Sequence, residues 1–172
     1  MFDQDQGLHL ARETVQAAQR LSLGGQPVSL ATAESLTGGL LGQLICSVPG
    51  ASEVYRGGVI SYATDLKAQL LGVDAQLLAQ RGAVDPDVAL AMAAGARRVC
   101  SATYALATTG VAGPAPADGK PVGRVYLALV GPGQLAICQE HSFEGDRQQI
   151  RLQAALAALS LLKGSLEAAL PQ

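Results

Sequence analysis

The sequence is poor in the residues on which several functional classes depend. Its 172 residues include no Trp, two Phe and four Tyr, so the interior must be built from small and aliphatic side chains. Two His without an H-E-x-x-H pattern argue against a histidine-bound metal. Three Cys, an odd number without C-x-x-C spacing, fit neither a disulfide framework nor a zinc site. We therefore expect free, mostly buried thiols, no metal and no cofactor.

Charge and hydropathy exclude two classes of partner. The net charge is −2 and no run of Lys or Arg occurs, which argues against nucleic acid as a partner. No uninterrupted apolar stretch approaches the roughly 20 residues that span a bilayer, which argues against a membrane. Residues 1–20 are amphipathic and begin with acids, without the basic start and apolar centre of a secretion signal. We expect a cytoplasmic protein.

The apolar residues, 49% of the chain, follow patterns that alternate between helix and strand. This alternation over one domain, residues 1–172, predicts a three-layer α/β/α fold with a mixed, mostly parallel sheet of about five strands. A late antiparallel hairpin is predicted around Gly131-Pro132-Gly133. The loops after the first three strands should meet at one sheet edge. Helices are predicted at 8–23, 40–48, 64–71, 74–80, 86–101 and 147–162, and strands at 28–33, 55–63, 104–108, 122–130 and 135–143.

A strand-to-helix turn supplies the first candidate site. The apolar run 28–33 is followed by polar residues and two glycines before a helical pattern starts at Leu40. Such a turn would place Ser35 at the carboxyl end of a sheet and point backbone N–H groups toward a ligand. Ser35 or Thr37 could equally be the N-cap of the helix. Capping does not require Gly38 and Gly39, which let a backbone approach a ligand closely.

Tyr62, at the end of the second predicted strand, and Lys67, shortly after it, could activate a serine. If Thr64 or Asp65 caps the next helix, Lys67 lies in its first turn, where the helix dipole and any burial favour a neutral amine. The negative charge of Asp65 would instead favour the protonated form of Lys67. Tyr62 could relay a proton or orient the lysine. The alternatives are a surface lysine and a strand-end tyrosine whose hydroxyl contacts water.

A third loop contains glycines and could bind a phosphate. Thr109, Gly110 and Gly113 form a stretch similar to a phosphate-binding turn, although it matches neither the dinucleotide nor the P-loop pattern. Arg147, at the start of the last predicted helix, could bind a phosphate through two hydrogen bonds or pair with nearby acids.

Several motifs, in order from about residue 8 to residue 162, resemble the CinA C-terminal domain family. They read A-E-S-L-T-G-G-L, V-P-G-A-S, Y-R-G-G-V-I-S-Y-A-T-x-x-K-x-x-L-L-G-V, G-A-V-D-P-D-V-A, T-T-G-V-A-G-P, K-P-V-G-R-V-Y-L-A and F-E-G-D-R. The resemblance implies a nicotinamide-nucleotide amidohydrolase of pyridine-nucleotide salvage, which converts nicotinamide mononucleotide (NMN) to nicotinate mononucleotide and ammonia. It also implies a catalytic set of Ser35 as nucleophile with Lys67 and Tyr62.

A mechanism that fits these residues can be written for this reaction, and the loops supply candidate binding residues. Lys67, directly or through Tyr62, would take the Ser35 proton, and the N–H groups of residues 37–39 would stabilise the oxyanion. The expected binding residues are Thr37, Gly38, Gly39, Thr109, Gly110, Gly113 and Arg147. The alternative function is a non-catalytic nucleotide-binding or regulatory domain linked to competence or DNA damage.

The resemblance also bears on domain content and assembly. Larger family members have an additional N-terminal pyrophosphatase-like domain, and since nothing precedes Met1 we expect the stand-alone form. Many members have G-G-T where this chain has residues 115–119, and S-N where it has Ala63-Thr64; both stretches lie by the expected pocket. The Ala/Leu faces of the first and last helices predict a homo-oligomer, a dimer or larger.

Overall fold

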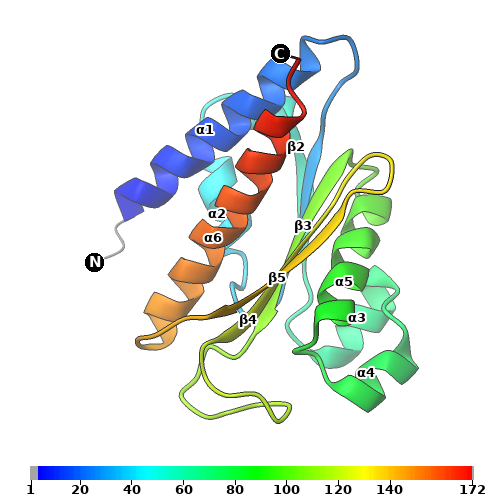
Figure 1. Cartoon of the computed structure of the whole chain (residues 1–172), viewed down its shortest axis with the longest axis vertical. Coiled ribbons are helices and arrows are strands. Elements are labelled where there is room, and N and C mark those ends of the chain that lie inside the picture. Colours follow the sequence, from blue (N-terminus) through cyan, green and yellow to red (C-terminus); the bar gives the residue numbers. More distant parts are fainter. Residues whose placement is uncertain (1–3, 172) are drawn as a thin grey trace.

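A five-stranded mixed sheet forms the middle layer of the protein (Figure 1). The computed structural model describes residues 4–171. The strand order is β2-β1-β3-β4-β5; β1 pairs in parallel with β2 and β3, whereas β4 is antiparallel to both neighbours. The predicted fold class and late hairpin are therefore confirmed. The strands are β1 (Leu30–Glu34), β2 (Tyr55–Ile60), β3 (Tyr104–Gly110), β4 (Arg124–Val130) and β5 (Ala136–Ser142).

Helices cover both faces of this sheet (Figure 1). One face carries α1 (Gln4–Ser22), α2 (Leu40–Cys46) and α6 (Arg147–Ala168). The other carries α3 (Thr64–Leu71), α4 (Ala75–Arg81) and α5 (Pro86–Val99), and a short 3₁₀ helix, η1 (Ala51–Glu53), precedes β2.

The two faces of the sheet differ in side-chain size. Because side chains alternate along a strand, Leu30 and Leu106 point to the α1/α6 face, whereas Ala31 and Ala105 point to the α5 face. Small residues allow α5 to pack closely on the sheet. At Gly95 in α5, an added Cβ would lie 2.1 Å from the Leu71 carbonyl oxygen at the end of α3, so α3 and α5 are in backbone contact.

Several predicted helix ends are confirmed. Asp74 and Asp85 cap α4 and α5 by accepting hydrogen bonds from the N–H groups of Gln76 and Asp87. Asp146 forms a capping box at the start of α6. Gly72 ends α3 with a left-handed conformation, φ 68°.

Other local predictions are wrong. Neither Ser35 nor Thr37 caps α2, whose N-cap is Gly39, and α3 starts after Ala63 without a side-chain cap. The strand predicted to reach residue 63 ends at residue 60, and the strand predicted to end at 108 continues to 110. The cysteines are free but not mostly buried: Cys46 is exposed, and Cys100 and Cys138 are half-buried.

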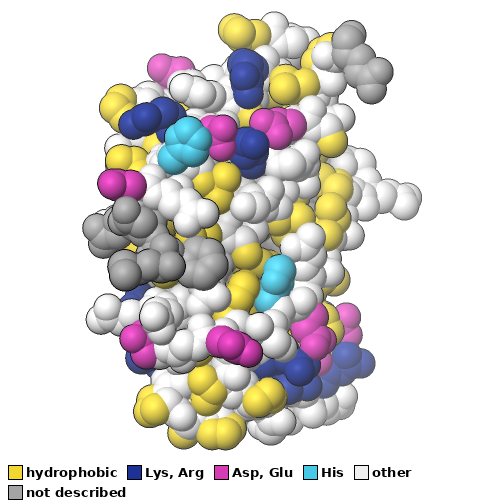
Figure 2. All heavy atoms as spheres, turned by 60° about the vertical axis from the view of Figure 1, so that its left-hand side comes forward, with side chains coloured by type: hydrophobic (Ala, Val, Ile, Leu, Met, Phe, Trp, Pro, Cys, Tyr) yellow, Lys and Arg dark blue, Asp and Glu magenta, His cyan; other side chains and the backbone are white. Residues whose placement is uncertain are grey.

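The apolar faces of α1 and α6 are buried within the chain. Their Ala and Leu residues pack against each other and against the sheet, so this pattern gives no separate reason for self-association, which stays a prediction. Figure 2 shows acidic, basic and hydrophobic side chains interspersed on the face brought forward there. Between residues 4 and 171, no helix combines the length and apolar character needed to cross a bilayer.

Candidate active site

Ser35 is the first residue after β1, at the carboxyl end of the parallel strands. Its N–H donates to the Thr108 carbonyl of β3 at 3.0 Å, which extends the β1–β3 ladder by one step. Its carbonyl accepts from the Gly38 N–H at 3.0 Å, which closes a tight turn. The residue is 9% exposed and lines a cavity of about 260 Å³.

The Glu34 carboxylate holds this turn from inside. It accepts hydrogen bonds from the backbone N–H groups of Gly39, Leu41 and Gly42 at 2.9, 3.1 and 2.8 Å. Glu34 is 2% exposed and therefore serves as a buried cap for α2, placed before the turn rather than within it. Sequence reasoning missed this role; an acid shortly before a helix start was the available signal.

The glycines have a local explanation that the sequence interpretation did not include. Gly38 and Gly39 adopt φ of 58° and 97°, a region that favours glycine. Their N–H groups donate to the Ser35 carbonyl and to Glu34, so these two amides are not available for the predicted oxyanion hole of residues 37–39, while a role for the Thr37 amide stays a prediction. Contact of either residue with a substrate stays a prediction, and both line a separate cavity of about 760 Å³.

Two further contacts fix the turn. The Arg151 guanidinium of α6 donates to the Leu36 and Thr37 carbonyls at 2.9 and 2.7 Å, a role that sequence reasoning also missed. The Thr37 hydroxyl pairs with that of Thr108 at 2.7 Å, and both side chains are fully buried. Thr37 therefore supports the turn from the protein interior.

Lys67 lies beside Ser35, as the family resemblance implies. Its side chain is 0% exposed, so the alternative of a surface lysine is wrong. Its Nζ atom is 3.1 Å from Ser35 Oγ and donates to the Ser61 carbonyl at 2.6 Å. Burial lowers the pKa of Lys67 to about 8, and the negative charge of Asp118, rather than of Asp65, opposes that shift.

Tyr62 and Arg147 contact each other across the same cavity. The Tyr62 side chain is 57% exposed, and its hydroxyl accepts a hydrogen bond from Arg147 Nη2 at 2.6 Å. Arg147 Nη1 donates to the Gly113 carbonyl at 2.6 Å. Arg147 thus bridges two loops through uncharged oxygens instead of pairing with acids in the structure, and proton relay by Tyr62 stays a prediction.

The cavity collects residues from the three strand-end loops and from α6. Thr109 and Gly110 belong to its wall, although the Thr109 hydroxyl already donates to the Ala83 carbonyl at 2.6 Å. Phosphate binding by these groups stays a prediction. The described residues at the cavity include Ser35, Leu36, Tyr62, Lys67, Ala83, Val84, Thr109, Gly110, Gly113, Asp118 and Arg147.

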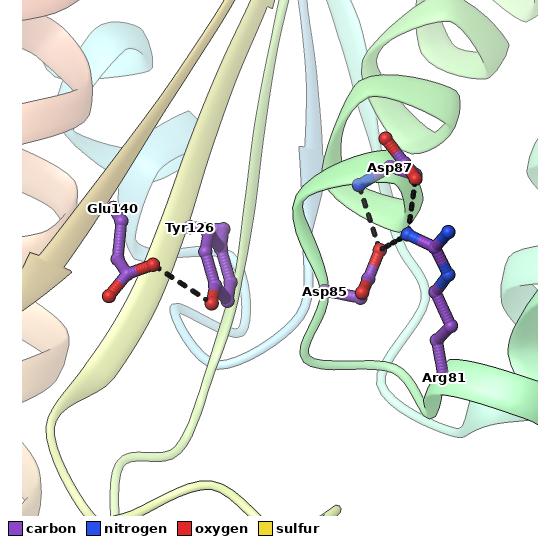
Figure 3. A network of polar contacts seen from close by, with 5 residues as sticks. All are labelled: Arg81, Asp85, Asp87, Tyr126 and Glu140. Atoms are coloured by element: carbon purple, nitrogen blue, oxygen red, sulfur yellow. Dashed lines mark hydrogen bonds and ion pairs between the residues drawn. The ribbon is translucent and has the colours of Figure 1, made fainter.

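Ala83 and Val84, which line the cavity at Ser35, directly precede the start of α5. Arg81 forms ion pairs with Asp85 and Asp87 there, and Figure 3 shows these side chains converging. On the other side of the same view, the Tyr126 hydroxyl donates to Glu140 at 3.1 Å between β4 and β5. In residues 4–171, no three His, Cys, Asp or Glu side chains are grouped so that they could hold a metal ion.

Comparison with known proteins identifies the family. Residues 12–166 match the CinA C-terminal domain. The chain belongs to the CinA C-terminal domain family. The resemblance found in the sequence is thereby confirmed, while the family name by itself does not specify a reaction.

Relatives and solved structures agree with this membership. A CinA-like protein of Frankia casuarinae is 52% identical over 80% of this chain, which covers 32% of that protein. Its counterpart in Anaeromyxobacter sp. is 50% identical over 86% of the chain and 35% of the relative, so the chain spans about a third of these curated relatives.

The fold agreement extends over almost the whole chain. The competence/damage inducible protein CihA of Agrobacterium tumefaciens superposes with a TM-score of 0.85 at 35% identity, covering 94% of this chain and 95% of that one. A CinA superfamily protein of Klebsiella pneumoniae gives a TM-score of 0.87 at 31% identity, covering 94% and 98%.

Proposed function

We propose that the protein hydrolyses the carboxamide of NMN, releasing ammonia and nicotinate mononucleotide. The observation that carries the proposal is the 3.1 Å contact between Ser35 Oγ and the Nζ atom of the fully buried Lys67. A serine beside a desolvated amine is a typical arrangement for an activated nucleophile in acyl transfer. The resemblance of the sequence motifs to the CinA C-terminal domain family implies the same reaction.

The lysine is suited to act as a general base. With its pKa lowered to about 8, the neutral fraction near neutral pH rises by roughly two orders of magnitude over that of an ordinary lysine. A neutral amine has one lone pair and two N–H groups. It can therefore accept the Ser35 proton while it continues to donate to the Ser61 carbonyl.

The chemical steps balance without a further reactant except water. Lys67 takes the Ser35 proton as Ser35 Oγ bonds to the carboxamide carbon, and the protonated lysine then gives this proton to the leaving nitrogen. Ammonia departs and leaves an acyl-serine. Water, deprotonated by the neutral lysine, attacks the ester carbon. The protonated lysine gives that proton to Ser35 Oγ as the ester bond breaks, which restores Ser35 and the neutral lysine and releases nicotinate mononucleotide.

The oxyanion donor has to be a group other than the amides of Gly38 and Gly39. Leu36 directly follows the nucleophile and lines the same cavity. In strand–turn–helix nucleophile sites, the N–H of the residue after the nucleophile is a usual donor. We assign this role to the Leu36 N–H, and the phosphate to Arg147 with the loop 109–113.

Ammonia release from NMN tests the proposal. We expect turnover by the wild type, and a fall of about 10³-fold or more in both Ser35→Ala and Lys67→Met, because each variant removes one half of the nucleophile–base pair. Matched controls are Ser160→Ala and Lys163→Met on α6, away from the cavity, which should keep wild-type rates. Circular dichroism should show that all four variants are folded.

Two results would contradict the proposal. Full activity of Ser35→Ala would exclude the assigned nucleophile. No ammonia from wild type, together with NMN binding, would instead favour the non-catalytic nucleotide-binding domain that the competence/damage names of the structural relatives leave open.

A further inference from the structure

The cavity at Ser35 contains one acidic side chain that the proposed mechanism does not use. Of the described residues that line it, Asp118 alone is an Asp or Glu, whereas Lys67 and Arg147 are basic. Asp118 is exposed and belongs to the loop between β3 and β4.

The Asp118 carboxylate is held in position. Ala117 and Lys120 form a bridge with reciprocal backbone hydrogen bonds of 3.2 and 2.8 Å, and the two residues between them have φ of 51° and 68°. This is a tight two-residue turn of the kind that Asp-Gly favours. Asp118 Oδ2 also accepts from the Ala83 N–H at 2.6 Å.

Close packing beneath the turn supports the same position. Gly82 has φ of 74°, and a Cβ at that residue would lie 2.7 Å from Asp118 Cγ. The segment 82–83 and the loop tip are therefore in direct contact. These contacts hold the Asp118 carboxylate in one position at the cavity.

The charges in the cavity are separated rather than paired in one bridge. Arg147 donates to the uncharged oxygens of Tyr62 and Gly113. Asp118 accepts from a backbone amide, and its charge acts on Lys67. The site therefore offers a basic group for an anion and, on another loop, an acidic group for a cation.

We infer that Asp118 is a specificity-determining residue that selects carboxamides carried on a cationic pyridinium ring. The inference rests on the proposed function. In an N-ribosylated nicotinamide, the charged ring nitrogen lies two bonds from the carbon that bears the carboxamide. A substrate whose carboxamide reaches Ser35 therefore brings its positive ring into the cavity that Asp118 lines, while its phosphate can bind Arg147.

Reduced NMN provides a probe for this selection. Its dihydropyridine ring is neutral, but it has the same carboxamide, ribose and phosphate. Ser35→Ala serves as the background, because both nucleotides can then be titrated by calorimetry without turnover. Asp118→Asn is added to that background, since the amide keeps the side-chain size and an oxygen that can accept from the Ala83 N–H.

We expect Ser35→Ala to bind oxidised NMN more tightly than reduced NMN. Addition of Asp118→Asn should weaken oxidised NMN about 5- to 10-fold and change reduced NMN by less than about twofold. Asp65→Asn in the same background is the matched control, because it removes a nearby acid that does not line the cavity, and it should leave the preference unchanged.

The outcomes separate the inference from the proposed function. Equal weakening of both nucleotides by Asp118→Asn would mean that the carboxylate only holds the loop, and would overturn the inference alone. An unchanged preference would overturn it as well. If Ser35→Ala bound neither nucleotide, the proposed function would be contradicted and the inference would fall with it.

Discussion

Lys67 occupies a position in which a charged amine would lose its hydration. Its side chain is fully buried, and its two hydrogen-bond partners, Ser35 Oγ and the Ser61 carbonyl, are uncharged. Desolvation disfavours the ammonium form, which is why the pKa of Lys67 falls to about 8. The Asp118 charge acts in the opposite direction and limits this fall.

This balance predicts a specific pH dependence. A general base has to be neutral, so kcat/KM for NMN should be low in acid, rise with pH and level off above about pH 8. Asp118→Asn removes the charge that favours ammonium, and should move the rising limb to lower pH. Initial rates between about pH 6 and about pH 10 provide the measurement.

One form of the pH profile of kcat/KM would contradict the assignment of Lys67 as the general base. If kcat/KM fell on passing from pH 7 to pH 9, the active form of Lys67 would be the protonated one. Asp65→Asn again serves as the control, since Asp65 does not perturb the Lys67 pKa and its removal should leave the limb in place.

The hydrogen-bond partners of Tyr62 and Arg147 bear on the roles expected for these two residues. The Tyr62 hydroxyl contacts the Arg147 guanidinium, whereas the Lys67 Nζ atom lies 3.1 Å from Ser35 Oγ without an intervening residue. A phosphate bound at Arg147 would compete with the Gly113 carbonyl and the Tyr62 hydroxyl for its donors. Binding of an anion at Arg147 would therefore alter its contacts with the loops after β2 and β3.

At the level of elements, α3 carries Lys67 and is positioned by α5. The carbonyl of Leu71, at the end of α3, accepts from Arg98 Nη2 at 2.8 Å and lies over Gly95. No side chain fits between these backbones. The position of the Lys67 amine thus depends on a glycine in α5.

Two glycine-to-alanine variants test this dependence. Gly95→Ala should destabilise the protein by about 1–3 kcal/mol and lower activity, because its Cβ would push α3 away. Gly164→Ala in α6 is the matched control: nothing lies within 4 Å of its added Cβ, so helix propensity should stabilise it by up to about 1 kcal/mol. Urea unfolding measures both.

The comparison has a clear failing result. If Gly95→Ala were as stable and as active as Gly164→Ala, close contact between α3 and α5 would not position Lys67. A loss of stability with full activity would mean that the α3–α5 contact stabilises the fold but does not position Lys67.

At the scale of the whole molecule, the cavity joins parts that are distant in the chain. Its walls come from the ends of β1, β2 and β3, from α3 and from α6. Of these elements, α3 and α6 lie on opposite faces of the sheet. A ligand in this cavity should therefore stabilise the complete fold rather than one segment of it.

Binding should accordingly raise the melting temperature. For Ser35→Ala with NMN at about 100 times its dissociation constant, linkage gives about 2.7 kcal/mol. For a chain of this size that corresponds to an increase of about 5–10 °C. Nicotinamide alone, without ribose and phosphate, is the control and should give a much smaller shift at the same concentration.

Either of two melting results would count against the assigned ligand. An equal shift with nicotinamide would mean that Arg147 and the 109–113 loop contribute no affinity. No shift with NMN, at concentrations that saturate binding in calorimetry, would mean that the ligand binds unfolded chain equally well.

Local sequence patterns were sufficient to locate the helices and strands and the edge of the sheet at which their loops meet. Apolar periodicity and capping residues such as Asp85 and Asp146 are local signals, so most helices and strands could be located from them. Because parallel strands end at the same edge of a sheet, the proximity of the loops with Ser35 and Lys67 could be predicted from the strand pattern. Spacing alone still left Lys67 as either a base or a surface residue.

The environment of each functional group, in contrast, depends on how the folded chain packs. Burial of Lys67, the Tyr62–Arg147 contact and the Glu34 cap depend on packing between segments far apart in the chain. The amides of Gly38 and Gly39 were predicted to face a ligand, yet they are used within the turn. Periodicity reports which face of an element is apolar, whereas a pKa or a hydrogen-bond partner is set by the atoms that the folded chain brings next to it.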